Sequence, residues 1–422
     1  MPVPNVWRVA VTARAVMPLH GVGGLERSVR DLVRHLGRRG VQVTLITPPP
    51  TTEPALAPAD FQSPMVELLH VPYLTFPLAN RRGTTILDRS TAYLVFGLRA
   101  GRAALDLVRQ GRVDVVHGFG ASALGYALGR SDARAPLVLN PQGLEEFGAT
   151  AANQPVLKRL AYTPLRRAVR LTARAADCIL ATDASLEATV RRHLRPRPGQ
   201  VRVVPNGIDY DEVTTQAGPV DGARLRRAHD IGPDELVWLS VGRLEANKGF
   251  DVLAAALAAA SAPGRSLAAV KWRWVVVGAG PRRRSLERAV GRRGLSGRVL
   301  FTGRVGDRDL HAWYEAASVF VHPTRYEGSS LVTLEAMAHR RPVVATTSGG
   351  LPDKVRPGIN GWLVPPDDAA ALARALEDAA AHRAALDRLG DASAEIVRLE
   401  FAWSGLVNRQ IAIYEELLAR RT

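Results

Sequence analysis

Residues 322–366 read HPTRYEGSSLVTLEAMAHRRPVVATTSGGLPDKVRPGINGWLVPP, and this stretch indicates the fold of the second half of the chain. The apolar run SVFVH (318–322) predicts a buried strand, TRYEGSS predicts a loop, and LVTLEAMAHR predicts a helix. The first turn of that helix would leave the backbone N–H groups of Ser330, Leu331 and Val332 without intrahelical partners. Such a helix end favours anions, so the stretch predicts an anion site at a strand-to-helix turn.

Two glutamates flank this predicted anion site. Glu327 lies in the loop before the helix, and Glu335 lies between one and two turns into it. Carboxylates accept hydrogen bonds from hydroxyl groups. An anion site between two such carboxylates suits a ligand with a diphosphate in the middle and a sugar ring at each end, which describes a nucleotide sugar.

These residues closely resemble the retaining glycosyltransferases of family 4, whose signature is a glutamate, seven residues and a second glutamate, followed by a GG turn. The resemblance covers nearly the whole second half, through LSVGRLEANKGFD (239–251), VVVGAGP (275–281), LFTGRVGDRDLHAWYEAASVFVHPTRYEG (300–328) and GINGWLVPPDD (358–368). In the first half it is limited to GVGGLERSV (21–29), VDVVHGFG (113–120), NPQGLEEF (140–147) and VVPNGID (203–209). The resemblance implies the GT-B fold, in which two Rossmann-like domains face a cleft.

The length of 422 residues favours two domains, because one core rarely organises so long a chain. Apolar runs alternate with helical patterns throughout, which predicts an α/β protein of two doubly wound parallel sheets. We expect an N-terminal domain over 1–207 and a donor-binding domain over 208–400. The polar stretch 206–222 would be the connection between them. By resemblance, the helix at 401–422 packs back onto the first domain.

The expected strands are short apolar runs followed by glycine, proline or polar residues. In the first half these are 8–13, 41–47, 113–117, 136–140, 178–182 and 201–205. In the second half they are 236–242, 272–278, 298–303, 318–322 and 342–347.

A second group of chemically informative residues lies in GRLEANKGFD (242–251), where an apolar strand ends and two cations, Arg243 and Lys248, follow. Negative charge accumulates on the diphosphate when a nucleotide sugar loses its sugar, and preorganised cations stabilise that change. The family's matching arginine and lysine bind the donor diphosphate. We therefore expect the same role for Arg243 and Lys248.

The resemblance also assigns roles to the carboxylates and to two glycine pairs. Glu327 would hold sugar hydroxyls and stabilise positive charge at the anomeric carbon, and Glu335 would hold the nucleotide ribose. The pairs would let backbone approach the donor closely. They are Gly23 with Gly24, and Gly349 with Gly350. Family members transfer sugar with retention, by front-face attack through an oxocarbenium-like transition state.

One residue departs from the family pattern. Family members commonly carry a histidine just after the strand that matches PLVLN (136–140), where this chain has Gln142. Glutamine still exchanges hydrogen bonds with sugar hydroxyls but gains no charge near neutral pH. We expect Gln142 and also His117, which ends the apolar run VDVVH, to contact substrate.

The formal charge of +16 comes almost entirely from arginine. Residues 157–174 combine leucines with arginines around Pro164, and Leu157, Leu160, Leu165, Val169 and Leu171 would pack inward. The outward cations would face water or an anionic membrane surface, as a lipid-linked acceptor would require. One cysteine, Cys178, and the lack of a membrane span or signal sequence predict a cytoplasmic protein. The basic cluster adds the hypothesis that the protein attaches peripherally to the inner membrane face.

Other classes fit less well. Asp209-Tyr210-Asp211 and Asp307-Arg308-Asp309 resemble a metal-binding aspartate pair, but aspartates also favour helix starts. We expect no metal and no cofactor beyond the nucleotide sugar. GFGASA (118–123) resembles a dinucleotide fingerprint, yet Asn140 stands where an acid should bind ribose. A glycoside hydrolase with two catalytic carboxylates would not need the cation pair. The chain also lacks the aromatic residues, interleaved with basic ones, that are typical of nucleic-acid-binding proteins. The nearest alternative is another GT-B enzyme, such as a nucleotide-sugar hydrolase or epimerase.

Overall fold

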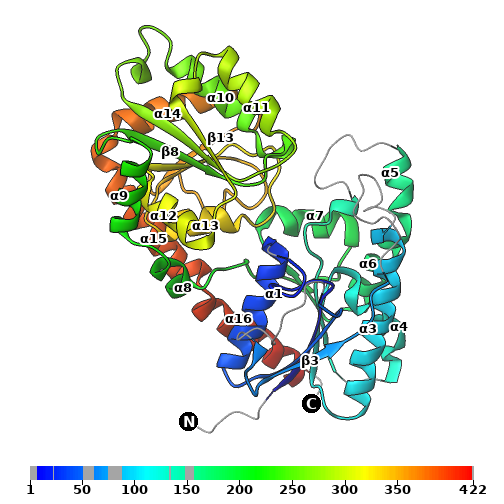
Figure 1. The fold of residues 1–422 in the computed structure, drawn as a ribbon. Helices are drawn as coiled ribbons and strands as arrows, with labels where there is room; N and C mark the ends of the chain where they lie inside the picture. The colour runs from blue at the N-terminus through cyan, green and yellow to red at the C-terminus, as the bar shows by residue number, and fades with distance from the viewer. Residues whose placement is uncertain are drawn as a thin grey trace. The chain divides into compact units, whose positions relative to one another are not determined.

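The computed structural model describes residues 7–21, 23–50, 61–74, 88–132, 135–147 and 156–420. The chain forms two compact units, Met1–Asn206 with Trp403–Thr422, and Gly207–Ala402. Figure 1 shows the helices and strands that make up the units. We expected the boundary between residues 207 and 208, and the two units meet between Asn206 and Gly207.

The described part of the first unit contains a seven-stranded parallel sheet, in the order β3-β2-β1-β4-β5-β6-β7. Its strands are β1 (Arg8–Thr12), β2 (Gln42–Thr47), β3 (Val66–His70), β4 (Val115–Phe119), β5 (Leu137–Asn140), β6 (Cys178–Ala181) and β7 (Val201–Val203). Its helices are α1 (Gly24–Arg38), α3 (Ala92–Arg109), α4 (Leu124–Gly129), α5 (Val156–Ala161), α6 (Thr163–Ala175), α7 (Ala184–Leu194) and α16 (Trp403–Ala419).

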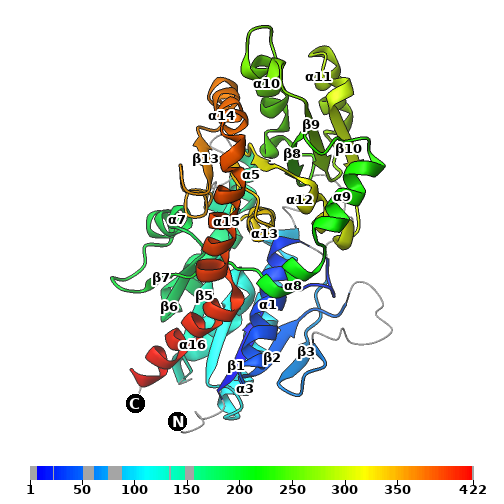
Figure 2. The same cartoon turned by 90° about the vertical axis from the view of Figure 1, so that its left-hand side faces the viewer.

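Helices cover both faces of this first sheet. One core combines side chains of the sheet with α1 and α16, and the other combines them with α3, α4, α6 and α7. Figures 1 and 2 show α1 and α16 lying next to each other on the same face. Because each central strand is buried on both sides, its sequence is almost continuously apolar, as parallel sheets require.

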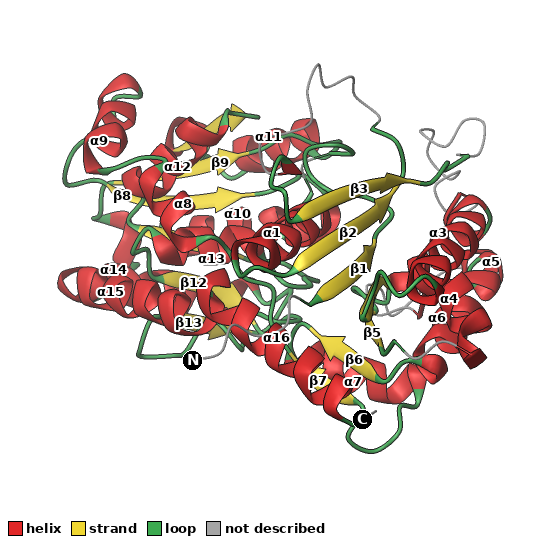
Figure 3. Cartoon of the chain, turned by 90° about the horizontal axis from the view of Figure 1, so that it is seen from below, coloured by secondary structure: helices red, strands yellow, loops and turns green. Residues whose placement is uncertain are grey.

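The described part of the second unit contains a six-stranded parallel sheet, in the order β10-β9-β8-β11-β12-β13. Its strands are β8 (Leu236–Val241), β9 (Trp272–Val277), β10 (Val299–Gly303), β11 (Val319–His322), β12 (Val343–Thr346) and β13 (Gly361–Val364). Its helices are α8 (Tyr210–Thr215), α9 (Pro219–Ala228), α10 (Phe250–Ala260), α11 (Arg283–Arg292), α12 (Asp307–Ala316), α13 (Leu331–Ala338), α14 (Ala369–Ala381) and α15 (Leu386–Ile396). Figure 3 shows the helices of both units in red and their strands in yellow.

The second unit is also doubly wound. The core on one face contains α10, α11 and α14, and that on the other contains α8, α9, α12 and α13. Trp238, Trp272 and Trp274 are buried within β8 and β9, where their area contributes strongly to the core. The prediction of two doubly wound α/β domains is confirmed.

The sequence analysis did not predict two strands, β3 and β13, and both lie at sheet edges. β3 and β13 are half-exposed, and β3 carries Glu67 and His70, so its pattern is less apolar than that of a central strand. Edge strands have one neighbour and less burial, which weakens the hydrophobic signal.

Residues 206–222 are not the irregular connection that we expected. They contain α8 and the start of α9. Asp209 caps α8, because its carboxylate accepts a hydrogen bond from a first-turn N–H at 3.2 Å. Pro219 opens α9, where the missing N–H would have no intrahelical partner. Asp209 and Pro219, which resembled loop signals in the sequence, therefore stand at the starts of helices.

The basic segment breaks into α5 and α6, and Pro164 stands in the first turn of α6. Two of the residues predicted to point inward are buried, Leu165 and Val169. Leu160 and Leu171 are instead 64% and 45% exposed, so the inward prediction was wrong for them. The break resets the helical phase, and a single continuous apolar face is lost. The side chain of Leu157 lies outside the described part of the structure.

Candidate active site

A cluster of charged side chains forms at the carboxyl edge of the second sheet. Glu327 lies in the loop between β11 and α13, and its Oε2 accepts a hydrogen bond from Lys248 Nζ at 2.5 Å. His322 Nε2 lies 2.8 Å from the same oxygen. Lys248 follows β8 and His322 ends β11, so adjacent strands deliver both residues to this edge. The structure thus brings Lys248 and Glu327 together and adds His322.

Two glycines hold the Glu327 loop in place by direct backbone contact. A Cβ on Gly249, next to Lys248, would lie 1.9 Å from the carbonyl oxygen of Pro323. A Cβ on Gly349 would lie 1.7 Å from the carbonyl oxygen of Glu327. Both glycines also adopt positive φ angles, +65° and +55°, which favour glycine over other residues. The position of the carboxylate therefore depends on backbone packing from two other loops.

The charge state of the cluster follows from its contacts. Burial alone would raise the pKa of Glu327, but the hydrogen bond from His322 and the charge of Lys248 outweigh it and lower that pKa to about 2. Burial lowers the pKa of His322 below its ordinary value, against the opposing effect of Glu327. At pH 7 the imidazole is therefore mostly neutral, and it donates its Nε2–H to the ionised carboxylate of Glu327.

The second glutamate is held by a different partner. Glu335 on α13 is 2% exposed, and its Oε2 accepts a hydrogen bond from the Tyr314 hydroxyl of α12 at 2.8 Å. The ring of His339 stacks on Tyr314 with centroids 5.7 Å apart. This packing fixes the carboxylate one turn inside α13.

The amino end of α13 agrees with the sequence prediction. Ser330 is the N-cap residue, and Leu331 and Val332 begin the helix. The Ser330 side chain makes no capping hydrogen bond, and its Oγ instead accepts one from Thr333 Oγ1 at 2.9 Å. The backbone N–H groups of this turn are left without a side-chain cap from Ser330, as an anion-binding helix end requires.

Arg243 is placed differently from Lys248. Its side chain is 78% exposed, and Nη2 lies 2.6 Å from Oε1 of Glu245 in the same loop. Gly350, by contrast, is buried, and its carbonyl accepts a hydrogen bond from Lys354 Nζ at 3.0 Å. The contacts of Arg243 in this structure join it to its own loop rather than to the Glu327 cluster.

In the first unit, Gly23 and Gly24 lie at the amino end of α1, where Gly23 is the N-cap. Gln142 follows β5 at the carboxyl edge of the first sheet and adopts a positive φ of 63°. Its Nε2 donates to Asn140 Oδ1 at 3.0 Å, which holds the side chain close to the strand end. Non-glycine residues with such angles gather at functional sites.

The surroundings of His117 do not favour the predicted substrate contact, which stays a prediction. His117 lies inside β4, is 1% exposed, and bonds through Nδ1 to the Tyr414 hydroxyl of α16 at 2.7 Å. It also stacks on Phe119. Burial lowers its pKa to about 3, so it stays neutral and serves the core. β4 continues two residues beyond the predicted strand end, which moves His117 from the edge into the sheet.

His322 and Tyr314 were missed by the sequence analysis. His322 carried a signal, because it is a polar residue ending a buried apolar run directly before the Glu327 loop. Tyr314 carried none, since nothing local shows that its hydroxyl meets Glu335.

Among the described residues, no group of three or more histidine, cysteine, aspartate and glutamate side chains lies close enough to hold a metal ion. Asp209 caps α8, while Asp307 and Asp309 lie in the first turn of α12. Both pairs therefore occur at helix starts.

Comparison with known proteins agrees with this architecture. Residues 22–212 match the family described as Glycosyltransferase Family 4, and residues 235–382 match Glycosyl transferases group 1. The D-inositol 3-phosphate glycosyltransferase of Streptomyces scabiei is 30% identical over 413 residues, covering 94% of this chain and 88% of that protein.

Solved structures share the fold over nearly the whole chain. Sucrose-phosphate synthase from Thermosynechococcus elongatus has 26% identity and a TM-score of 0.77, covering 98% of this chain and all of the other. The Anabaena protein HepE in complex with UDP has 20% identity and a TM-score of 0.70, covering 97% and 99%. Together with the family matches and the two doubly wound units, these likenesses show that the chain is a glycosyltransferase of family 4 with the GT-B fold.

Proposed function

We propose that this glycosyltransferase moves a sugar from a nucleotide diphosphate sugar to a hydroxyl group of a small-molecule, glycan or lipid-linked acceptor, with retention of anomeric configuration. The observation that carries the proposal is the cluster of Lys248, His322 and Glu327 next to the amino end of α13. It joins an ionised carboxylate, a cation and a turn of backbone donors, which match a sugar ring and a diphosphate.

In this proposal Glu327 acts as a fixed negative charge. With a pKa of about 2 it has no proton to give at neutral pH, so it is unsuited to general acid catalysis. It accepts hydrogen bonds from the donor sugar's hydroxyls and stabilises positive charge as the anomeric carbon loses its leaving group. Its Oε2 already accepts from Lys248 and His322, which reduces its nucleophilicity.

Lys248 and Arg243 would stabilise the departing diphosphate. An ammonium group has three N–H donors, and Lys248 gives one of them to Glu327, so the others can reach phosphate oxygens. The exposed guanidinium of Arg243 would turn from Glu245 towards the diphosphate when donor binds. Backbone N–H groups of Ser330, Leu331 and Val332 would bind the diphosphate. The backbone at Gly349 and Gly350, and separately that at Gly23 and Gly24, would give the donor room to approach. Glu335 would hold the ribose.

Retention follows from attack on the face that the diphosphate leaves. The bond from the anomeric carbon to the diphosphate oxygen breaks, and a bond from the acceptor oxygen forms on the same face. The acceptor's proton passes to the departing phosphate oxygen, so no protein nucleophile is needed. Because the two cations supply the positive charge, we propose catalysis without a metal or another cofactor.

The comparisons indicate which ligands to test first. HepE was solved with UDP, and the Streptomyces scabiei relative is named for D-inositol 3-phosphate. We therefore propose UDP-sugars and GDP-sugars as donors, and inositol 3-phosphate as the first acceptor to test. Gln142, at the carboxyl edge of the first sheet, would contact an acceptor hydroxyl.

We also propose that the first unit attaches peripherally to an anionic membrane through α5 and α6, as a lipid-linked acceptor would require. Leu160 and Leu171 are exposed beside the exposed cations Arg159, Arg167 and Arg170. Exposed apolar side chains next to arginines are the pattern of a helix that lies in a membrane interface. The acidic cytoplasmic leaflet would attract this charge. None of the described helices is long and apolar enough to cross a bilayer.

A thermal-shift panel followed by product analysis tests the proposed reaction. A nucleotide sugar at about 100 times its dissociation constant should stabilise the protein by about 2.7 kcal/mol, and the matching nucleotide diphosphate should also bind. With that donor and an acceptor, NMR should show one new glycoside with the anomeric configuration of the donor. Inversion would refute retention, and donor cleavage at an equal rate without acceptor would show a hydrolase.

Flotation with liposomes tests the membrane attachment. The protein should float with phosphatidylserine vesicles at low salt, and the double variant Leu160→Ser/Leu171→Ser should float less. Leu128→Ser is the matched control, because Leu128 is an exposed leucine on α4. Equal flotation of all three proteins, or none at all, would refute the attachment.

A further inference from the structure

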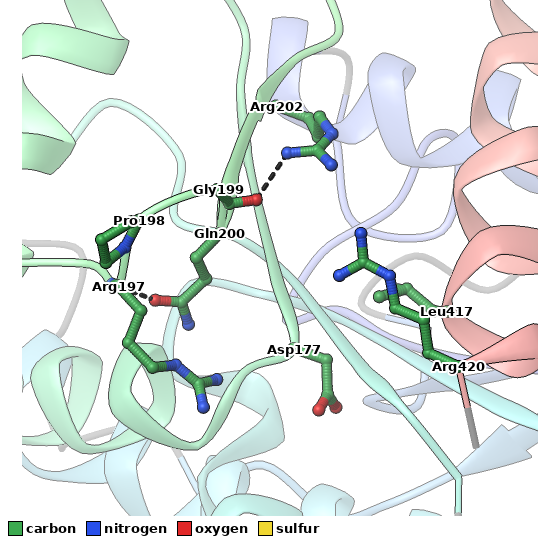
Figure 4. A pocket seen from close by; sticks show the side chains of 8 residues that line it. All are labelled: Asp177, Arg197, Pro198, Gly199, Gln200, Arg202, Leu417 and Arg420. Atoms are coloured by element: carbon green, nitrogen blue, oxygen red, sulfur yellow. Dashed lines mark hydrogen bonds between the residues drawn. The ribbon is translucent and has the colours of Figure 1, made fainter.

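A pocket of about 500 Å³ lies in the first unit, and no residue assigned to catalysis lines it. Its volume falls within the range of about 300–1,000 Å³ that ligand pockets occupy. Figure 4 shows that its side chains come from three segments: the start of β6, the turn and strand of β7, and the end of α16. The residues that matter here are Asp177, Arg197, Gln200, Arg202, Leu417 and Arg420.

The pocket is at the amino edge of the sheet. Asp177 directly precedes β6, and Gln200 directly precedes β7. Gln142, Gly23 and Gly24, which are candidate site residues of this unit, lie at the carboxyl edge, where ligands of open α/β sheets usually bind. β6 has four residues, which separates the two edges by about 13 Å at 3.3 Å per residue. A ligand here would not occupy the acceptor site.

Positive charge around the pocket exceeds negative charge in the described residues. Arg202 Nη2 lies 3.2 Å from Oε1 of Glu416, and Arg420 contacts the same oxygen. Asp177 is paired with Arg130 at 2.7 Å. Arg197 has no carboxylate partner among the described residues. Four guanidinium groups therefore share two carboxylates, which leaves a surplus of two positive charges.

The guanidinium groups also keep unused donors. Each has five N–H groups. Arg197 donates one side-chain hydrogen bond in the described structure, to the Ala176 carbonyl at 2.8 Å, and Arg420 donates one, to Glu416. A phosphate group accepts several such bonds in bidentate geometry, and arginine matches it better than lysine does.

Hydrogen bonds of Gln200 hold the turn that presents Arg197. Gln200 is buried, and its Nε2 donates to the carbonyls of Ala173 and Ala176 at 2.9 and 2.6 Å. Its Oε1 accepts from the backbone N–H of Arg197 at 2.8 Å, and Gly199 supplies a positive φ of 74°. A preformed turn lowers the entropy lost when a ligand binds.

We propose that this pocket binds a phosphate monoester, a small molecule whose dianionic phosphate is held by Arg197, Arg202 and Arg420. The surplus of two positive charges matches the charge of the phosphate, and the remaining volume would hold the organic part against Leu417. Because Leu417 belongs to the end of α16 and Arg420 directly follows that helix, the ligand would connect it to the β6–β7 edge. The proposal does not depend on the reaction proposed above.

Isothermal titration of the full chain with glucose 6-phosphate and with inorganic phosphate, at about 150 mM NaCl to screen weak surface binding, tests this. The double variant Arg197→Gln/Arg420→Gln should bind at least about tenfold more weakly, since it removes charged hydrogen bonds. Lys248→Met should leave this binding unchanged, which separates it from phosphate binding at the donor site. Glucose should not bind at this pocket.

Arg109→Gln is the matched control, because it removes one exposed charge on α3 without touching the pocket. Its binding should equal that of the unaltered protein. The proposal is overturned if neither phosphate compound binds, if the double variant binds as well as the unaltered protein, or if Arg109→Gln weakens binding as much. Circular dichroism of the double variant checks that it is folded.

Discussion

Tyr314 on α12 donates its hydroxyl hydrogen to Glu335 on α13 at 2.8 Å, and both side chains are buried. The bond joins residues 21 positions apart in the sequence. It fixes one oxygen of the carboxylate that we propose holds the donor ribose. The orientation of Glu335 therefore depends on a residue outside the glutamate motif.

Tyr314→Phe should weaken nucleotide binding, because it removes this hydrogen bond and keeps the ring. We expect a loss of about 1–3 kcal/mol in the free energy of unfolding and about tenfold weaker binding of the nucleotide diphosphate, measured by urea unfolding and calorimetry. Tyr126→Phe is the matched control, since the buried Tyr126 hydroxyl donates to the Ala135 carbonyl in the other unit. Equal nucleotide affinity in both variants would show that Tyr314 does not position Glu335.

Substitutions of Lys248 and Arg243 should both lower turnover, but only that of Lys248 should also lower the free energy of unfolding. Lys248→Ala removes the cation that pairs with the largely buried carboxylate of Glu327 and leaves it only the neutral His322, so it should lower both turnover and the free energy of unfolding. Arg243 is exposed, so Arg243→Ala should lower turnover alone. We expect losses in kcat on the order of 10²-fold or more in each, and little change in Arg265→Ala, which removes an exposed arginine paired with Glu377. Near-normal turnover in both variants would remove their assignment to the diphosphate.

Gly349→Ala should displace the Glu327 loop. The new methyl group would lie 1.7 Å from the Glu327 carbonyl oxygen, and alanine at a φ of +55° costs about 1–2 kcal/mol by itself. Gly358→Ala isolates the second effect, because Gly358 has a φ of +76° and an added methyl group there would meet no atom within 4 Å. Turnover should fall at least about tenfold in the first variant and stay near normal in the second. Equal turnover would mean that the contact does not set the carboxylate's position.

Glu327 should make stability depend on pH in the acid range. Its pKa is lowered from 4.5 to about 2, so its ionised form stabilises the fold above about pH 4.5, and that contribution is lost as the pH falls towards 2. This lowering of the pKa corresponds to roughly 3 kcal/mol in the free energy of unfolding. Urea unfolding should show the largest difference in free energy of unfolding between the unaltered protein and Glu327→Gln at about pH 5–7. That difference should shrink by about pH 3. A gap that stays constant with pH would contradict the ionised pair.

Local sequence patterns were enough to predict the fold and most of the motif. Continuous apolar runs such as LVWLSV, alternating with helices, predict central parallel strands, because a strand buried on both faces must be apolar on both. The glutamate spacing and the strand-to-helix turn identify Glu327, Glu335 and the amino end of α13. These are local properties, and a local pattern records which face of an element is buried.

Which distant residues meet became visible only in the folded chain. Lys248 and Glu327 are 79 positions apart, and His117 and Tyr414 are 297 apart. Periodicity cannot tell which element covers a buried face, so it placed His117 at a strand end and gave no sign of Tyr314. The guanidinium cluster around Arg197 and Arg420 exists for the same reason: residues far apart in the chain become neighbours only when α16 packs against the first sheet.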